Sequence, residues 1–170
     1  MKKLFVFAPI AFALAVTSHA QAATQADLML KGTIVNTTCE VTANEGASSL
    51  NIGSFSKTGF TTAKAQVGSE PLTVTLANCT EDEVGALQVT GLSPGSDNNI
   101  FVSDLNQSAG FMLKETDGTT QVYNGASMPV TADETGALAY TFKVGMTVMN
   151  TGAVIPGPYT APIKISYVNN

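Results

Sequence analysis

The chain has 170 residues, of which 12% are charged, with eight lysines, no arginine and 13 acidic residues. The resulting net charge of −5 at pH 7 argues against nucleic acid and anionic membrane surfaces as partners. The length allows one sizeable domain and leaves little room for two.

The first 23 residues have the pattern of a secretory signal peptide. Lys2 and Lys3 precede an apolar run from Leu4 to Val16, and a stretch of small residues ends at Ala23. The apolar run is too short for a bilayer span, which needs about 20 apolar residues. We therefore expect cleavage after Ala23, export, and no membrane insertion once the leader is removed.

The mature N-terminus, residues 24–36, alternates with the period of an extended strand. One face of that strand would carry Ala26, Leu28, Leu30, Gly32 and Ile34. Gly32 interrupts this apolar face without a side chain, which is typical of close approach by another backbone or side chain. On the pattern alone, the segment fits equally well a first strand of the domain's own sheet.

Further candidate strands follow along the chain, because apolar residues alternate in short runs. The clearest alternation covers residues 72–76 and 142–148. The other candidates are residues 86–92, 99–102, 111–115, 121–123, 137–149 and 159–168. Segments rich in Gly, Pro, Asn and Asp separate them and predict turns. Many short strands with this spacing predict an all-β sandwich.

The two cysteines, Cys39 and Cys79, lie 40 residues apart in a chain that is expected to be exported. Disulfides form and persist in exported proteins, so we expect the two thiols to be bonded; two free buried thiols are the alternative. In the chain-entropy model a loop of this length contributes about 4 kcal/mol to stability.

The mature chain offers little catalytic chemistry. Its only histidine, His19, is removed with the leader, and bonded cysteines cannot act as nucleophiles. The one acidic run, Glu81 to Glu83, falls in a predicted turn, and we interpret it as a solvated loop. We therefore predict that the chain is not an enzyme and has no catalytic residue, metal site or cofactor.

Two segments resemble the chaperone–usher pilins, in particular the type 1 fimbrial subunits. Residues 28–41, LMLKGTIVNTTCEV, and residues 72–79, LTVTLANC, are similar to the segments that carry the two cysteines in that family. Gly157 is fourteenth from the C-terminus, as in many such pilins, and residues 163–167 resemble their terminal strand. Tyr167 departs from the usual next-to-last position, which leaves the register of the terminal strand open.

The resemblance implies an incomplete immunoglobulin-like β-sandwich, the pilin fold, which is completed by a donor strand from a neighbouring subunit. It divides the chain into a signal peptide (1–23), an N-terminal donor-strand extension (24–36) and a pilin domain (37–170). It also implies a structural subunit of a bacterial fimbria that polymerises by donor-strand exchange and supports cell adhesion. The implied partners are neighbouring pilin subunits, a periplasmic chaperone and an outer-membrane usher, on a route through the periplasm to the cell surface.

The same resemblance assigns residue roles. The donor-strand face would be Ala26, Leu28, Leu30, Gly32 and Ile34. The groove edge and C-terminal strand would contain Gly157, Ile163, Ile165 and Tyr167, and the strand of Cys39 would form the other edge of the groove.

Two other functions remain open from the residues. One is a receptor- or carbohydrate-binding fimbrial adhesin or minor tip subunit, although tip adhesins of this system resemble two domains in tandem without a donor extension. The other is a secreted enzyme or inhibitor with a closed sandwich, which would be a stable monomer without a partner. The short extension before Gly32 does not decide between a major and a minor subunit.

Overall fold

The computed structural model describes residues 39–169, so the predicted leader and donor extension lie outside the described residues. The strands are β1 (Glu40–Ala43), β2 (Val67–Ala77), β3 (Val84–Gly91), β4 (Ala109–Lys114), β5 (Ser127–Thr131), β6 (Leu138–Val148) and β7 (Ile163–Asn169). The helical elements in this part of the chain are the short 3-10 turns η1 (Asn44–Gly46), η2 (Lys57–Gly59) and η3 (Thr151–Ala153), and none could cross a membrane.

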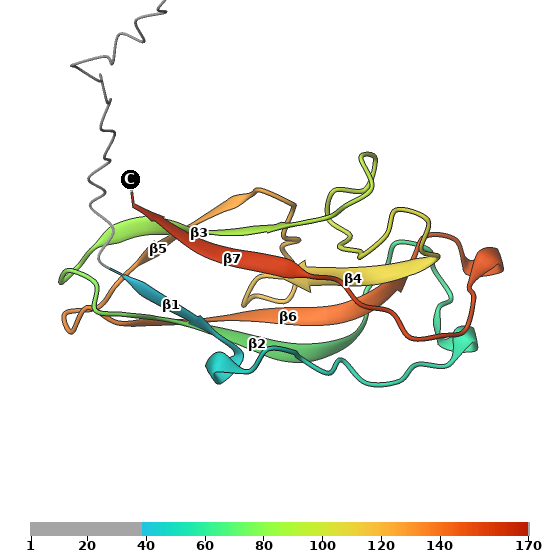
Figure 1. Ribbon diagram of the computed structural model, residues 1–170, viewed down its shortest axis with the longest axis horizontal. Coiled ribbons are helices and arrows are strands. Elements are labelled where there is room, and N and C mark those ends of the chain that lie inside the picture. The colour runs from blue at the N-terminus through green and yellow to red at the C-terminus, as the bar shows by residue number, and fades with distance from the viewer. Residues whose placement is uncertain (1–38, 170) are drawn as a thin grey trace, which may run out of the picture. The chain divides into compact units, whose positions relative to one another are not determined.

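The strands form two antiparallel sheets that face each other (Figure 1). One sheet has the order β1-β2-β6-β4, and the other has the order β5-β3-β7. The prediction of an all-β sandwich is thus confirmed. The strands at the four sheet edges are β1, β4, β5 and β7, and their different surroundings determine where the sandwich is closed.

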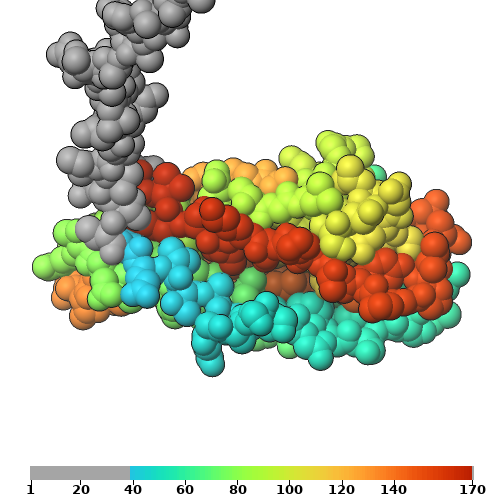
Figure 2. All heavy atoms as spheres, in the orientation of Figure 1, coloured from blue at the N-terminus to red at the C-terminus, as the bar shows by residue number. Residues whose placement is uncertain are grey.

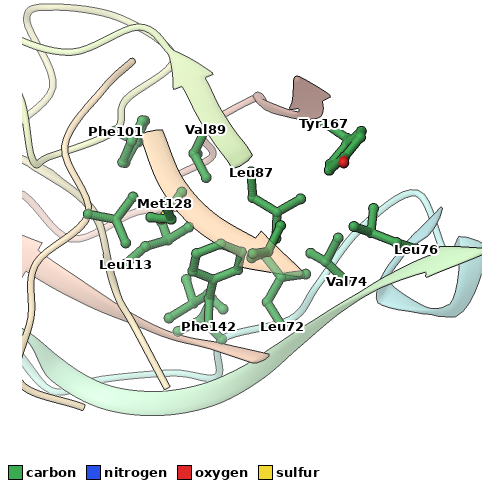
Figure 3. Packing of buried hydrophobic residues seen from close by; sticks show 14 residues of the cluster. Leu72, Val74, Leu76, Leu87, Val89, Phe101, Leu113, Met128, Phe142 and Tyr167 are labelled. Carbon is green, nitrogen blue, oxygen red and sulfur yellow. The ribbon is translucent and has the colours of Figure 1, made fainter. Parts of the chain in front are cut away.

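The core lies between the sheets and follows from the alternation in the sequence. In the second half of β2 every second residue points inward, and Leu72, Val74 and Leu76 are all at most 6% exposed. Side chains from β3, β6 and β7 meet them, as Figure 3 shows for Leu87 and Phe142. Burying one such side chain contributes about 1.5 to 3 kcal/mol, so this shared core holds the two sheets together.

Residues 100–102 close one side of the sandwich by crossing between the sheets. The backbones of Phe101 and Phe111, which is in β4, exchange two hydrogen bonds of 2.8 and 2.9 Å. The Val102 amide donates to the Leu92 carbonyl, just beyond β3, at 2.9 Å. Farther along β4, the Val122 amide donates to the carbonyl of Leu113 at 2.9 Å. Both flanking segments therefore cover the outer edge of β4.

The predicted strands at residues 99–102 and 121–123 are wrong as strands, since each makes only isolated bridges to its neighbours. Turns enclose them on both sides, so neither can continue a ladder. The strand β5 was not predicted, because Pro129 stands at its centre. A proline has no N–H for a ladder and is tolerated on an edge strand, which is where β5 lies.

Candidate functional site

The edges of β1 and β7 border an open groove on the side opposite the crossing segment. Within the described residues, β1 pairs only with β2 and β7 pairs only with β3. The start of β1 and the end of β7 both lie beside the turn between β2 and β3, so the two strands run in opposite directions. Figure 2 shows this face, with the red C-terminal segment and the blue-to-teal segment on the two sides of the hollow.

The groove has two sections that share Leu50, Ile52, Phe111 and Tyr159 in their walls. The larger section has a volume of about 750 Å³ and lies between residues 41–52 and 159–165. The smaller section, about 380 Å³, continues between residues 50–60 and 154–159. The shared wall residues make the two sections one continuous trough along β7 and the loop before it.

The groove reaches down to the hydrophobic core. Core residues Leu72, Leu113 and Val144 form part of its lining. Its rim consists of apolar side chains that pack against the core and stay partly exposed, namely Val41, Ala43, Leu50, Phe111, Ile163 and Ile165. An apolar patch of this kind marks an interaction site, because a self-sufficient domain would cover it.

The groove walls are nearly free of charge. No charged side chain lines the larger section, and Lys57 is the only charged residue along the smaller one. No group of three or more His, Cys, Asp or Glu side chains in residues 39–169 could hold a metal ion. The arrangement therefore suits an apolar, extended ligand, and it places no set of acid, base and nucleophile together.

The disulfide prediction is confirmed. Cys39 and Cys79 are bonded, with their Cα atoms 4.2 Å apart; Cys39 directly precedes β1, and Cys79 lies two residues after the end of β2. The bond fixes the start of the β1 wall to the turn that leads into β3. Both cysteines also pack against the core.

The other expected groove residues fall in three places. Ile163 and Ile165 line the larger section, and Gly157 lines the smaller one, where a Cβ would have no atom within 4 Å. Tyr167 shares the inward face of β7 but is only 8% exposed and lies in the core beyond the lined section. The expected donor face, residues 26–34, lies outside the described residues.

The terminal strand has a single register in the structure, which answers the question left by the unusual position of Tyr167. Tyr167 stands opposite Leu87 and Asn169 opposite Gly85, so β7 continues two residues beyond the tyrosine. The Tyr167 hydroxyl donates a hydrogen bond of 3.2 Å to Oε1 of Glu83. Burial first, and then this bond, raise the pKa of Tyr167.

Sequence reasoning missed Glu83. Its run of acids was interpreted as a solvated loop, but Glu83 is half-buried and its carboxylate bonds to β7. It also missed the residues that form the groove floor, since Leu113 and Val144 have ordinary core patterns. Only the three-dimensional arrangement of β1 and β7 shows that a groove reaches these residues.

The chain also matches known proteins. The model of the family described as "Fimbrial protein" matches residues 28–167. The fold is similar to a subunit in the structure of a chaperone–usher pilus that reveals the molecular basis of rod uncoiling, with a TM-score of 0.63 and 14% identity over 88% of this chain and 98% of that chain. It is also similar to the P pilus rod subunit PapA, with a TM-score of 0.65 and 14% identity over 79% of this chain and 100% of that chain.

No curated protein matches the chain by sequence. The family match covers most of the chain, from the expected donor face to Tyr167 near the end of β7. The chain therefore belongs to the fimbrial protein family and is a structural pilin subunit, not an enzyme.

Proposed function

We propose that this subunit polymerises by donor-strand exchange, in which the N-terminal segment of one copy fills the groove of the next. The observation that carries the proposal is the nearly uncharged groove between two sheet edges, β1 and β7, that lack a second partner in the described residues. An extended peptide that adds to such an edge gains ladder hydrogen bonds, and alternate side chains enter the groove.

The predicted donor face matches this groove in chemistry and length. Leu28, Leu30 and Ile34 are apolar, as the groove walls are, and burying them contributes about 5 to 9 kcal/mol before ordering costs. The nine residues from Ala26 to Ile34 span about 30 Å as a strand, and the seven residues of β7 span about 23 Å. The remaining length would lie along the loop that precedes β7, which lines the smaller section of the groove.

The cell biology follows from the same exposed surface. An uncovered core beside two free edges is an aggregation hazard, so the subunit needs a temporary cover after export. A periplasmic chaperone that lends a strand would provide it, and an outer-membrane usher would exchange that strand for the next subunit's extension. The product is a surface fimbria that supports cell adhesion.

A peptide experiment tests the proposal. The mature chain is refolded with and without a synthetic peptide of residues 24–38, and thermal melting and unboiled gel ladders are recorded. A peptide with Leu28→Asp and Leu30→Asp serves as the control. We expect the native peptide alone to raise the melting temperature and cap the chain as a monomer; a stable monomer indifferent to both peptides would contradict the proposal.

Gly32 supplies a second test. It stands where the donor face lacks a side chain, and we expect it to cross a shallow part of the groove. Gly32→Leu should then reduce polymer yield, measured by gel ladder, without weakening binding of the free domain to the native peptide. Thr33→Leu, which changes the opposite face, is the control, and equal yields from Gly32→Leu and the native chain would overturn the assignment.

A further inference from the structure

The turn from Cys79 to Glu83, here called the brace, contacts both walls of the groove at one end. At its first residue, the disulfide to Cys39 holds the start of β1. At its last residue, the Glu83 carboxylate holds the end of β7. One short connection between β2 and β3 therefore ties together two strands that do not pair with each other.

The Glu83 side chain is oriented before it reaches β7. Its Oε2 accepts a 2.8 Å hydrogen bond from the Thr80 amide inside the brace. Its Oε1 accepts bonds from the Tyr167 hydroxyl at 3.2 Å and the Asn169 amide group at 3.0 Å. Tyr167 and Asn169 are two residues apart, so both point to the same face of the strand and reach one carboxylate together.

Gly85 makes this contact specific for one register. The Tyr167 ring lies against the Gly85 backbone, and a Cβ at position 85 would clash with the phenol. A shift of β7 by two residues would keep the same face inward but would take Tyr167 away from both Gly85 and Glu83. A shift by one residue would turn Tyr167 outward.

We propose that the brace sets the register and spacing of the groove walls before any strand fills the groove, with Glu83 as the positioning residue for β7. β7 has a single partner strand in the described residues, β3, so the bonds from Glu83 add a second, independent contact that fixes its register. The positions of Ile163 and Ile165 relative to Val41 follow from the brace. The consequence for assembly rests on the proposed donor-strand function.

The test compares Glu83→Ala with Glu81→Ala, a matched control that removes a nearby, exposed carboxylate in the same turn. Each refolded mature chain receives the peptide of residues 24–38 with a photoreactive group in place of the Leu30 side chain, and cross-links are mapped by mass spectrometry. We expect one cross-linked site on β7 in the native chain and in Glu81→Ala. In Glu83→Ala the cross-links should spread by two residues, and the peptide should dissociate about tenfold faster.

Two further measurements keep the inference separate from the proposed function and from simple misfolding. Amide hydrogen exchange of β7 in the chain without peptide should accelerate about tenfold in Glu83→Ala and not in Glu81→Ala. Tyr167→Phe keeps the ring and removes the hydroxyl, so its effect on exchange should largely disappear in the Glu83→Ala background, where the hydroxyl has lost its acceptor. Unchanged exchange in Glu83→Ala overturns the brace, whether or not the peptide binds; failure of the native chain to bind peptide refutes only the donor-strand function.

Discussion

The two sheets of this sandwich meet along two sides, and the chain covers the core on one side and leaves a groove on the other. On one side, residues 100–102 bridge from β4 to the end of β3, and the side chain of Phe101 is fully buried between the sheets. On the other side, β1 and β7 leave a trough of about 750 Å³ over the core. The comparison shows that the chain can close a seam with its own backbone, and that residues 39–169 do so at one of the two places.

The largest loss of stability should come from truncating the side chain that fills the closed side. Phe101→Ala removes a ring that is 0% exposed, and such truncations cost about 3 to 5 kcal/mol. Leu105→Ala, in the next loop and 58% exposed, should change stability by less than about 0.5 kcal/mol. Urea unfolding of the peptide-filled chain measures both, and similar costs would contradict the view that residue 101 closes the seam.

Two glycines compare the sides more directly. A Cβ at Gly110, on β4, would meet the Phe101 carbonyl oxygen at 2.7 Å, whereas a Cβ at Gly157, beside the groove, would meet nothing within 4 Å. Gly110→Ala should therefore cost about 1 to 3 kcal/mol by overpacking, and Gly157→Ala close to nothing. Thermal melting of the two variants measures this difference in stability. Equal shifts in melting temperature would show that residues 100–102 move aside to make room for a Cβ at position 110.

On the open side, the effect of a substitution should be small in the empty chain and should grow when the groove is filled. Ile165 lies on the rim and is partly exposed, so Ile165→Ala should cost about 1 kcal/mol in the empty chain and about 2 to 4 kcal/mol with the peptide of residues 24–38 bound. Val168→Ala, on the outward face of β7, should be insensitive to the peptide. An equal cost of Ile165→Ala in both states would place Ile165 outside the interface.

The smallest effect is expected in alkali, from one tyrosine on each side. Burial and the nearby Glu115 carboxylate raise the pKa of Tyr140 to about 12 from 10.0, and burial and Glu83 raise that of Tyr167. Above pH 10 the unfolded chain therefore binds fewer protons than the folded chain, so the free energy of unfolding falls as pH rises toward about 12. Tyr140→Phe and Tyr167→Phe should each flatten this slope in denaturation series, and slopes equal to the native one would contradict the shifts.

The sequence predicts the regular part of this fold well, for a physical reason. In the middle of the fold, Leu72, Val74 and Leu76 of β2 and Phe142 and Val144 of β6 are buried while the residues between them are more exposed, so the two-residue period is plain there. β5 could not be predicted in this way, because Pro129 argues against a strand unless the strand lies at a sheet edge. The edge position is known only once the sheet is assembled. Residues 121–123 mislead in the other direction, because local alternation there has no neighbour for a longer ladder.

The residues of the groove and its surroundings also differ in whether the sequence predicts their roles. Ile163 and Ile165 could be predicted because a strand's alternation tells which side chains share a face. Glu83 could not, since its role depends on Tyr167, 84 residues away along the chain. The openness of the groove also depends on which edges lack partners, and that is decided by the order of strands rather than by any segment of sequence.

Pro129 has a consequence for the shape of the polymer. Two of the four edge strands are unavailable: residues 101 and 122 bond to the outer edge of β4, and the proline denies an N–H to any strand approaching β5. The two remaining edges, β1 and β7, border the same groove, so under the proposed donor-strand exchange each subunit would accept one strand and contribute one. Units with one acceptor and one donor would link into an unbranched thread.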